Sequence, residues 1–387
     1  MAFIALGLPD PLLGSAWSVM FPQFAVSLGA AAYIGTVVSA GTLCSVLLAD
    51  RFVRRFGTGR IVACGVLLLT AATFGFSIAW HYAMLLVCAG LLGAAAGAID
   101  VAVNRYVSLH YEARHMSWLH CFWGVGAFLG PIIMSGYLGP TQNWRGGYRA
   151  VAFILLGMAA VLFISLPLWR RREKQNPPGA DAIDGPTRPE TRSTGALLRI
   201  PGVKPAMLTF LFYTGMEATF ALWGASYLVS HKALGEAEAA AGAGLFFLGI
   251  TLGRLGSGFL TMLLAPKTLI RLGWCVFVLG AASLFLPLPA LALQILFLVC
   301  GLGCAPIYPN SVHETPRRFG EGPARKIIGF QIAASYFASL ILPPVFGTIT
   351  NRFGMGFFVG YVLVFAVLFA VCSERVMRVT PDSSCRR

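Results

Sequence analysis

Three acidic residues lie inside long apolar stretches of this chain. Asp10 lies in FIALGLPDPLLGSAWSVMF, Asp100 in LLVCAGLLGAAAGAIDVAV and Glu217 in LTFLFYTGMEATFALWGASYLV, whereas we expect the other acids in loops or at chain ends. A carboxylate in hydrocarbon costs about 3 kcal/mol on insertion scales. Each group must therefore face water, pair with a cation or carry a proton. All three options point to a path through a membrane.

These acids are the candidates for proton transfer. A carboxyl group shielded from water favours its neutral form, so it can take up and release a proton as its access to water changes. Asp10 is the first choice, because Pro9 and Pro11 interrupt the helix around it and broken helices often mark transport sites. Glu217 is the second choice and Asp100 the third. The alternatives are structural: Asp10 as a cap of freed backbone groups, Glu217 as a neutral hydrogen-bonded acid, and Asp100 as a paired gate.

Other side chains in the apolar stretches could bind a solute. Trp17, Trp123 and Trp223 could stack on the apolar face of a sugar ring, with core packing as the alternative. Arg254 is the only cation well inside an apolar run, and we expect it to act as a gate by pairing with an acid or with helix carbonyls, with contact to the solute as the alternative. The further polar candidates for solute binding are Asn104, His120, Tyr308, Asn310 and Gln331.

The composition indicates a chain that is mostly embedded in a bilayer. Of its 387 residues 57% are hydrophobic and only 11% are charged, with a mean hydropathy of +0.75. The net charge of +14 sits in short segments between apolar runs, which favours anchoring at a membrane surface over nucleic-acid binding. The nine cysteines show no metal-ligand spacing. We expect no metal, no cofactor and no nucleic-acid partner.

The apolar windows predict an all-α membrane protein with twelve transmembrane helices. Windows of about 20 apolar residues can cross a bilayer as helices, and these runs are too long for barrel strands. The predicted spans are approximately 2–28, 31–49, 61–79, 82–108, 117–139, 148–168, 203–230, 239–264, 268–288, 289–312, 325–349 and 354–373.

Lysines and arginines predict the orientation of these spans. They are concentrated after spans 2, 4, 8 and 10 and in the C-terminal tail, whereas the opposite connections hold few. Because cytoplasmic loops carry the excess of cations, both termini are predicted to be cytoplasmic. The expected location is the cell (inner) membrane.

The chain divides into two similar parts. We expect an N-terminal six-helix half (1–168), a cytoplasmic linker (169–202), a C-terminal six-helix half (203–373) and a cytoplasmic tail (374–387). Matching features recur at a nearly constant separation, which predicts two parallel pseudo-symmetric halves. The matches pair Asp10 with Glu217, Gly41 and Ser45 with Gly249 and Gly253, residues 97–100 with 305–308, and His120 with Gln331.

Several segments resemble the major facilitator superfamily, and its fucose–proton symporter group in particular. They are LGLPDPLLGSAW, GAAAGAIDVAVN, WLHCFWGVGAFLGP, GITLGRLGSG and APIYPN. The resemblance implies that spans 1, 4, 7 and 10 line a central cavity, and that carboxylates in helices 1 and 4, here Asp10 and Asp100, serve coupling and substrate binding. It also implies a gating role for Asp50 and Arg51 in LLADRFVRRFG, a segment that matches the family pattern only loosely.

The leading hypothesis is a secondary active transporter that takes up a sugar or similar small polar solute together with protons, by alternating access. The alternative on the same fold is a proton-driven exporter of drugs or metabolites. A third hypothesis, from another class, is a membrane sensor or scaffold that binds a ligand without transporting it. An enzyme is not expected, since no nucleophile–base pair emerges. The expected partners are the solute, protons and the lipid bilayer, and the chain is expected to be a monomer.

Overall fold

The computed structural model describes residues 1–111, 113–139, 141–169 and 194–380, and these form helices without any strand. Ten helices or helix pairs within this part are long and apolar enough to cross a membrane. The other two predicted spans correspond to α10 and α12, so every predicted span has a helical counterpart. Most of the predicted linker and the last seven residues of the predicted tail lie outside the described residues.

The N-terminal half contains the helices up to α7. They are α1 (Ala2–Gly7), α2 (Leu12–Gln23), the 3-10 helix η1 (Leu28–Ala30), α3 (Ala31–Phe56), α4 (Thr58–Ile78), α5 (Tyr82–His110), α6 (Ala113–Leu138) and α7 (Trp144–Ile164).

The C-terminal half follows the short helix α9 (Thr194–Leu198). Its helices are α10 (Val203–Ser230), α11 (Glu236–Leu260), α12 (Pro266–Ser283), α13 (Ala290–Cys304), α14 (Ile307–Phe319), α15 (Glu321–Phe353), the 3-10 helix η2 (Met355–Phe357) and α16 (Phe358–Val379).

Prolines break two of the predicted spans. Span 1 is divided into α1 and α2 around Pro9 and Pro11, and span 10 is divided into α13 and α14 at Pro306. Proline lacks the backbone N–H that continues a helix and crowds the preceding turn. Two predicted ends were wrong: span 10 runs on to Phe319, and α16 continues to Val379, so the predicted tail 374–387 begins as helix.

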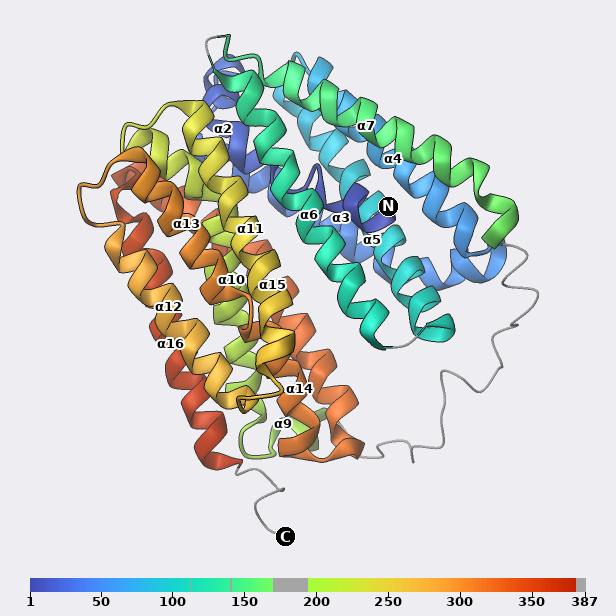
Figure 1. Ribbon diagram of the computed structural model, residues 1–387, viewed down its shortest axis with the longest axis vertical. Coiled ribbons are helices and arrows are strands. Elements are labelled where there is room, and N and C mark those ends of the chain that lie inside the picture. The colour runs from blue at the N-terminus through green and yellow to red at the C-terminus, as the bar shows by residue number, and fades with distance from the viewer. Residues whose placement is uncertain (112, 140, 170–193, 381–387) are drawn as a thin grey trace.

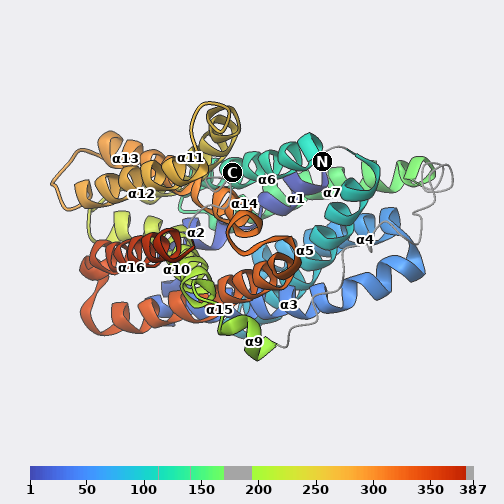
Figure 2. The same ribbon diagram turned by 90° about the horizontal axis from the view of Figure 1, so that it is seen from below.

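The two halves lie side by side, with the N-terminal half in blue to green and the C-terminal half in yellow to red (Figure 1). The packing between halves involves α6 with α11, α3 with α15 and α2 with α10. Seen from below, α15 and α3 are neighbours, and α6 lies next to α11 (Figure 2). Helices far apart in the sequence therefore form the interface at which a solute site is expected.

The same close helix contact occurs in both halves. A Cβ at Gly41 of α3 would lie 2.7 Å from the Gly90 carbonyl oxygen of α5, and a Cβ at Gly249 of α11 would collide with the Leu298 carbonyl of α13. Small residues let helix backbones approach this closely within a membrane. The predicted match of Gly41 with Gly249 is confirmed by these equivalent contacts.

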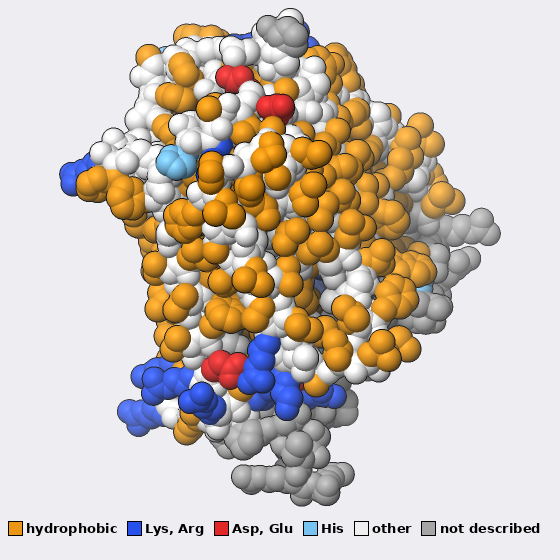
Figure 3. All heavy atoms as spheres, turned by 60° about the vertical axis from the view of Figure 1, so that its left-hand side comes forward, with side chains coloured by type: hydrophobic (Ala, Val, Ile, Leu, Met, Phe, Trp, Pro, Cys, Tyr) orange, Lys and Arg blue, Asp and Glu red, His pale blue; other side chains and the backbone are white. Residues whose placement is uncertain are grey.

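Charge is distributed as a membrane protein requires. An apolar belt covers the middle of the visible face, and lysines and arginines gather at one end (Figure 3). We call this the cation-rich end. The last turns of α3, α14 and α16 are basic, with Arg54 and Arg55 in α3, Arg317 and Arg318 in α14 and Arg378 in α16.

Candidate functional site

Asp10 lies in the break between α1 and α2. The backbone resumes hydrogen bonding at Leu12, whose N–H donates to the Pro9 carbonyl at 3.2 Å, and Ser15 Oγ donates to the Pro11 carbonyl at 2.8 Å. Pro9 and Pro11 are buried, whereas Asp10 is exposed. Among the described residues its carboxylate has no hydrogen bond or ion pair, and its charge is close enough to that of Glu217 to interact. The suggested capping role of Asp10 is not seen.

Glu217 forms an ion pair across helices within the C-terminal half. Arg254 Nη2 of α11 lies 3.9 Å from Glu217 Oε1 of α10, with 24% and 21% of the two side chains exposed. Arg254 thus pairs with an acid, as the sequence analysis expected, although its gating role stays a prediction. The Tyr213 hydroxyl, one helical turn before Glu217, donates to the Cys304 carbonyl at 3.2 Å.

Trp123 connects this pair to the other half. The guanidinium carbon of Arg254 lies 5.6 Å from the centre of the Trp123 ring, and Phe247 of α11 packs edge-on against that ring at 6.1 Å. His120, one turn earlier on α6, is exposed and packs edge-on against Phe3 at 5.4 Å. Trp123 therefore lies beside the guanidinium of Arg254, whereas His120 packs on Phe3, and their roles in solute binding stay predictions.

Asp100 and Asn104 form a polar pair on α5. Asn104 Nδ2 donates to Asp100 Oδ1 at 2.9 Å, and both residues are half-buried. Tyr308 of α14 and Tyr336 of α15 lie close enough to Asp100 for electrostatic interaction. This group spans the two halves, because α5 belongs to one and α14 and α15 to the other.

Four of the residues predicted to bind the solute are buried and hydrogen-bonded within the protein. Trp17 and Trp223 are fully buried, and their indole N–H groups donate to the carbonyls of Leu28 at 2.6 Å and Pro343 at 3.1 Å. The packing alternative therefore fits both tryptophans better than ring stacking on a solute.

The other two are the amides Asn310 and Gln331. The side chain of Asn310 is buried and donates to the Pro306 carbonyl at 2.6 Å. Gln331 is buried and accepts a hydrogen bond from Thr315 at 3.1 Å. The predicted match of Gln331 with His120 does not extend to their surroundings, since His120 is exposed beside an aromatic ring.

The predicted gating pair lies at the C-terminal end of α3. Arg51 is exposed there, and the side chain of Asp50 lies outside the described residues. Among the described residues, no hydrogen bond or ion pair joins Arg51 to Asp10, Asp100 or Glu217, and the gating role of the pair stays a prediction.

A buried ion pair in α14 was not foreseen. The expectation that the other acids lie in loops is wrong for Glu314, which is buried and bonded to Arg318, one turn later. Arg318 also donates to the Thr380 carbonyl at 2.8 Å. Because span 10 was expected to end at residue 312, the spacing of an acid and an arginine four residues apart was read as loop sequence. The missed signal was that i,i+4 spacing.

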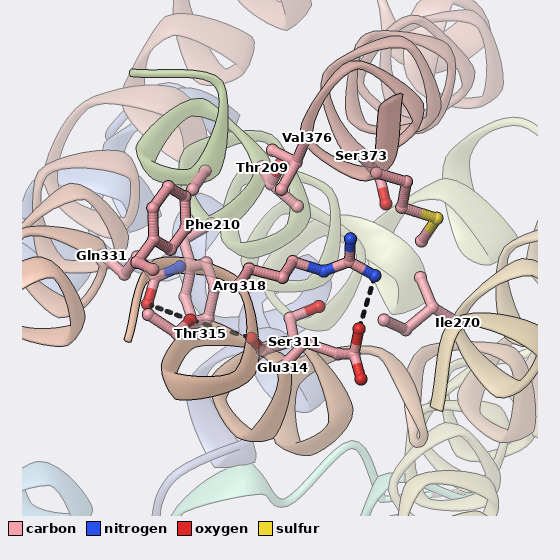
Figure 4. Close-up of a pocket in the computed structure, with 13 residues that line it drawn as sticks. Thr209, Phe210, Ile270, Ser311, Glu314, Thr315, Arg318, Gln331, Ser373 and Val376 are labelled. Atoms are coloured by element: carbon pink, nitrogen blue, oxygen red, sulfur yellow. Dashed lines mark hydrogen bonds and ion pairs between the residues drawn. The ribbon is translucent and has the colours of Figure 1, made fainter. Parts of the chain in front are cut away.

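This ion pair borders a small cavity of about 30 Å³ inside the C-terminal half, whose lining is mostly apolar. Figure 4 shows Ser311, Thr315 and Gln331 near the pair, with Thr209 and Ser373 from the neighbouring helices. Such a volume holds about one water molecule, so the cavity is too small for a solute. Within the described ranges, no three His, Cys, Asp or Glu side chains cluster closely enough to hold a metal.

Hydrogen bonds between the halves lie away from the cation-rich end. Among the described residues, the Gly29 N–H donates to Asn351 Oδ1 at 2.9 Å, and Gln142 Nε2 donates to Glu236 Oε1 at 3.1 Å. The ribbons of the two halves diverge towards α9 and the C-terminus (Figure 1).

Comparison with known proteins identifies the family to which this architecture belongs. The family model described as Major Facilitator Superfamily matches residues 1–343. The glucose/mannose transporter GlcP of Bacillus subtilis is 24% identical over 87% of this chain and 83% of that protein. Bypass of stop codon protein 6 of Saccharomyces cerevisiae is 22% identical over 91% of this chain and 76% of that protein.

Solved structures show the same fold. A single-residue mutant of the nucleoside transporter NupG matches with a TM-score of 0.71 at 14% identity, covering 98% of this chain and 97% of that one. A D-xylose-proton symporter matches with a TM-score of 0.72 at 11% identity, covering 98% of this chain and 96% of that one. With the family match over most of the chain, these findings show that the protein belongs to the Major Facilitator Superfamily, as a membrane-embedded secondary transporter of small solutes.

Proposed function

We propose that this transporter moves a sugar or a similar small polar solute together with protons. The single observation that carries the proposal is the state of Asp10. Its carboxylate lies in a helix break, is exposed between the halves, and has no hydrogen bond or ion pair among the described residues. An acid in that position is free to change its protonation when its access to water changes from one side of the membrane to the other.

Coupling follows if the solute binds the protonated carrier more tightly than the deprotonated one. A ligand shifts a conformational equilibrium only by its differential affinity for the two states. Protonation of Asp10 also relieves the repulsion between two nearby carboxylates, since Glu217 lies close enough to interact. The loaded carrier then closes around the solute and opens on the other side.

Support for a sugar comes from the relatives. One relative is a glucose/mannose transporter, and one protein of the same fold is a D-xylose-proton symporter, which moves its sugar with a proton. The charged pair of Glu217 and Arg254 and the half-buried ring of Trp123 suit a solute with hydroxyl groups and an apolar ring face.

The test uses the purified full chain in lipid vesicles. Wild-type protein should accumulate labelled D-glucose or D-mannose when the outside is more acidic than the inside. Asp10→Asn should abolish this accumulation and retain counterflow exchange of the same sugar. Accumulation by Asp10→Asn at the wild-type level would reject Asp10 as the proton carrier. Flux of lipophilic cations in place of sugars would favour the exporter alternative.

We infer in addition that the cation-rich end faces the cytoplasm of the cell. The support is the excess of arginines at the ends of α3, α14 and α16. A reporter enzyme that is active only outside the cytoplasm, fused after residue 387, should be inactive. An active reporter would reverse the assignment.

A further inference from the structure

Arg254 has unused hydrogen-bonding capacity in the middle of the molecule. A guanidinium carries five N–H donors in a planar fork. Within the described part of the chain, Arg254 makes one ion pair, with Glu217 at 3.9 Å, and no hydrogen bond. An arginine inside a membrane protein is expensive unless acceptors surround it. Its donors are therefore left for water or for oxygen atoms of a solute.

An aromatic surface lies beside this fork. The guanidinium carbon is 5.6 Å from the ring centre of Trp123, which is only half-buried. Trp123 belongs to α6 of the N-terminal half and Arg254 to α11 of the C-terminal half. Any solute that touches both residues is held by both halves at once, which is the geometry that alternating access requires of a substrate site.

The charges nearby decide between a neutral and an anionic ligand. Glu217 lies 3.9 Å from Arg254, and Asp10 is close enough to Glu217 for their charges to interact. A carboxylate or phosphate on the solute would be repelled by these acids. A neutral pair of hydroxyl groups on adjacent carbons can accept from the guanidinium fork and also donate to Glu217, so it satisfies both charged groups.

We propose that Arg254 and Trp123 form a solute-binding subsite for a neutral ring that carries a vicinal diol, such as a pyranose. Arg254 donates to the two adjacent hydroxyl oxygens, and the exposed part of the Trp123 indole packs on the apolar face of the ring. This assignment rests on the proposed sugar transport. It makes Arg254 a specificity-determining residue, where the sequence analysis gave it a gating role.

The test compares Arg254→Lys with wild type. Counterflow of labelled D-glucose in vesicles is competed by D-glucose and by its 2-, 3-, 4- and 6-deoxy analogues. In wild type, loss of a hydroxyl bonded to Arg254 should weaken competition about tenfold or more, because bonds to charged groups are the stronger ones. Lysine keeps the charge beside Glu217 but loses the fork. In Arg254→Lys the affinity for D-glucose should fall, and the affected deoxy analogue should compete as well as D-glucose.

Two further variants complete the design. Arg271→Lys, in an exposed ion pair with Glu374, is the matched control and should keep the wild-type pattern. Trp123→Phe should lower the affinity for D-glucose and for all deoxy analogues by a similar factor, because it reduces the packing on the ring and keeps the guanidinium fork of Arg254. If Arg254→Lys does not fold, Arg254→Gln combined with Glu217→Gln removes the charge imbalance and tests the same loss of discrimination.

The outcomes separate this subsite from the proposed function. A purely structural or gating Arg254 would lower the exchange rate and leave the ratio of D-glucose to each deoxy analogue as in wild type, and that result overturns the subsite alone. Stronger competition by D-glucuronate than by D-glucose in wild type overturns the neutral diol. Absence of counterflow with D-glucose, D-mannose and D-xylose in wild type overturns sugar transport, and the subsite with it.

Discussion

The first helix of each half carries an acid at a matching place, but the two acids have different surroundings. Asp10 lies in a helix break and is exposed, without a partner among the described residues, whereas Glu217 lies in the unbroken α10 and pairs with Arg254. Under the proposed proton coupling, this difference assigns separate roles to the two halves: Asp10 exchanges the proton, whereas the pair of Glu217 and Arg254 contacts the solute.

The cation-rich ends of the two halves differ in a similar way. In the N-terminal half the rings of Tyr106 and Trp169 pack at 4.7 Å. In the C-terminal half α14 holds the buried ion pair of Glu314 and Arg318, which also binds the Thr380 carbonyl. The contact described in the N-terminal half is thus aromatic, whereas the one in the C-terminal half is an ion pair.

The largest expected effect separates the two acids. If one proton moves with each solute, every unit of pH difference supports about tenfold accumulation. Asp10→Asn should reduce the accumulation ratio to one, whereas Glu217→Gln should keep a ratio that still follows the pH difference, with weaker solute binding. The measurement is uptake of labelled D-glucose into vesicles over a series of imposed pH differences. Equal loss of accumulation in both variants would show that the two acids act as one unit.

The second effect concerns the buried ion pair of Glu314 and Arg318 in the C-terminal half. Removal of one partner from a buried ion pair costs about 3–5 kcal/mol where the other charge is left unpaired. Without Arg318, Glu314 keeps only the longer contact of 3.8 Å with the exposed Arg317, so we expect a loss at the lower end of that range. Arg318→Met should therefore lower the melting temperature of the purified protein strongly, and Glu314→Leu combined with Arg318→Met should recover most of the loss.

The control is the exposed pair of Arg271 and Glu374, with side chains 53% and 37% exposed. Arg271→Met should cost no more than about 1 kcal/mol, because exposed ion pairs contribute little. A double variant of Glu314 and Arg318 that melts as early as Arg318→Met would contradict the assignment of the loss to an unpaired charge.

Local sequence features foretold the parts of the structure that depend on local physics. The spans follow from the length of the apolar runs, the break at Asp10 follows from Pro9 and Pro11, and the close helix contact at Gly249 follows from a missing side chain. Asp10 and Trp123 were also placed in the site from their positions in these runs.

Contacts between distant helices were beyond the reach of such features. Tyr336 became part of the site only because α15 places it near Asp100. Trp17 and Trp223 do not belong to the candidate site, because their indole N–H groups donate to backbone carbonyls on other segments. The sequence names the residue types available for a site, whereas the packing decides which of them a solute can reach.

A third prediction tests the internal repeat. A Cβ at Gly41 or Gly249 meets backbone of the neighbouring helix, which cannot move aside as a side chain can. Gly41→Ala and Gly249→Ala should each destabilise the protein by about 1–3 kcal/mol. In the same helix as Gly249, Gly256 has open space around it, so Gly256→Ala should be neutral or stabilising by up to about 1 kcal/mol. Thermal melting of the three variants measures this. Destabilisation at only one of the two matched positions would contradict the match of Gly41 with Gly249.

The smallest effect is expected where the repeat fails. Gln331 was matched with His120, yet it is buried and accepts its hydrogen bond from Thr315 at 3.1 Å. Thr315→Val should cost about 1 kcal/mol, because a buried amide loses its donor. The same variant should leave the D-glucose affinity in counterflow unchanged, since the cavity beside Gln331 holds only about one water molecule. A loss of D-glucose affinity at unchanged stability would place Gln331 in the solute path and restore its match with His120.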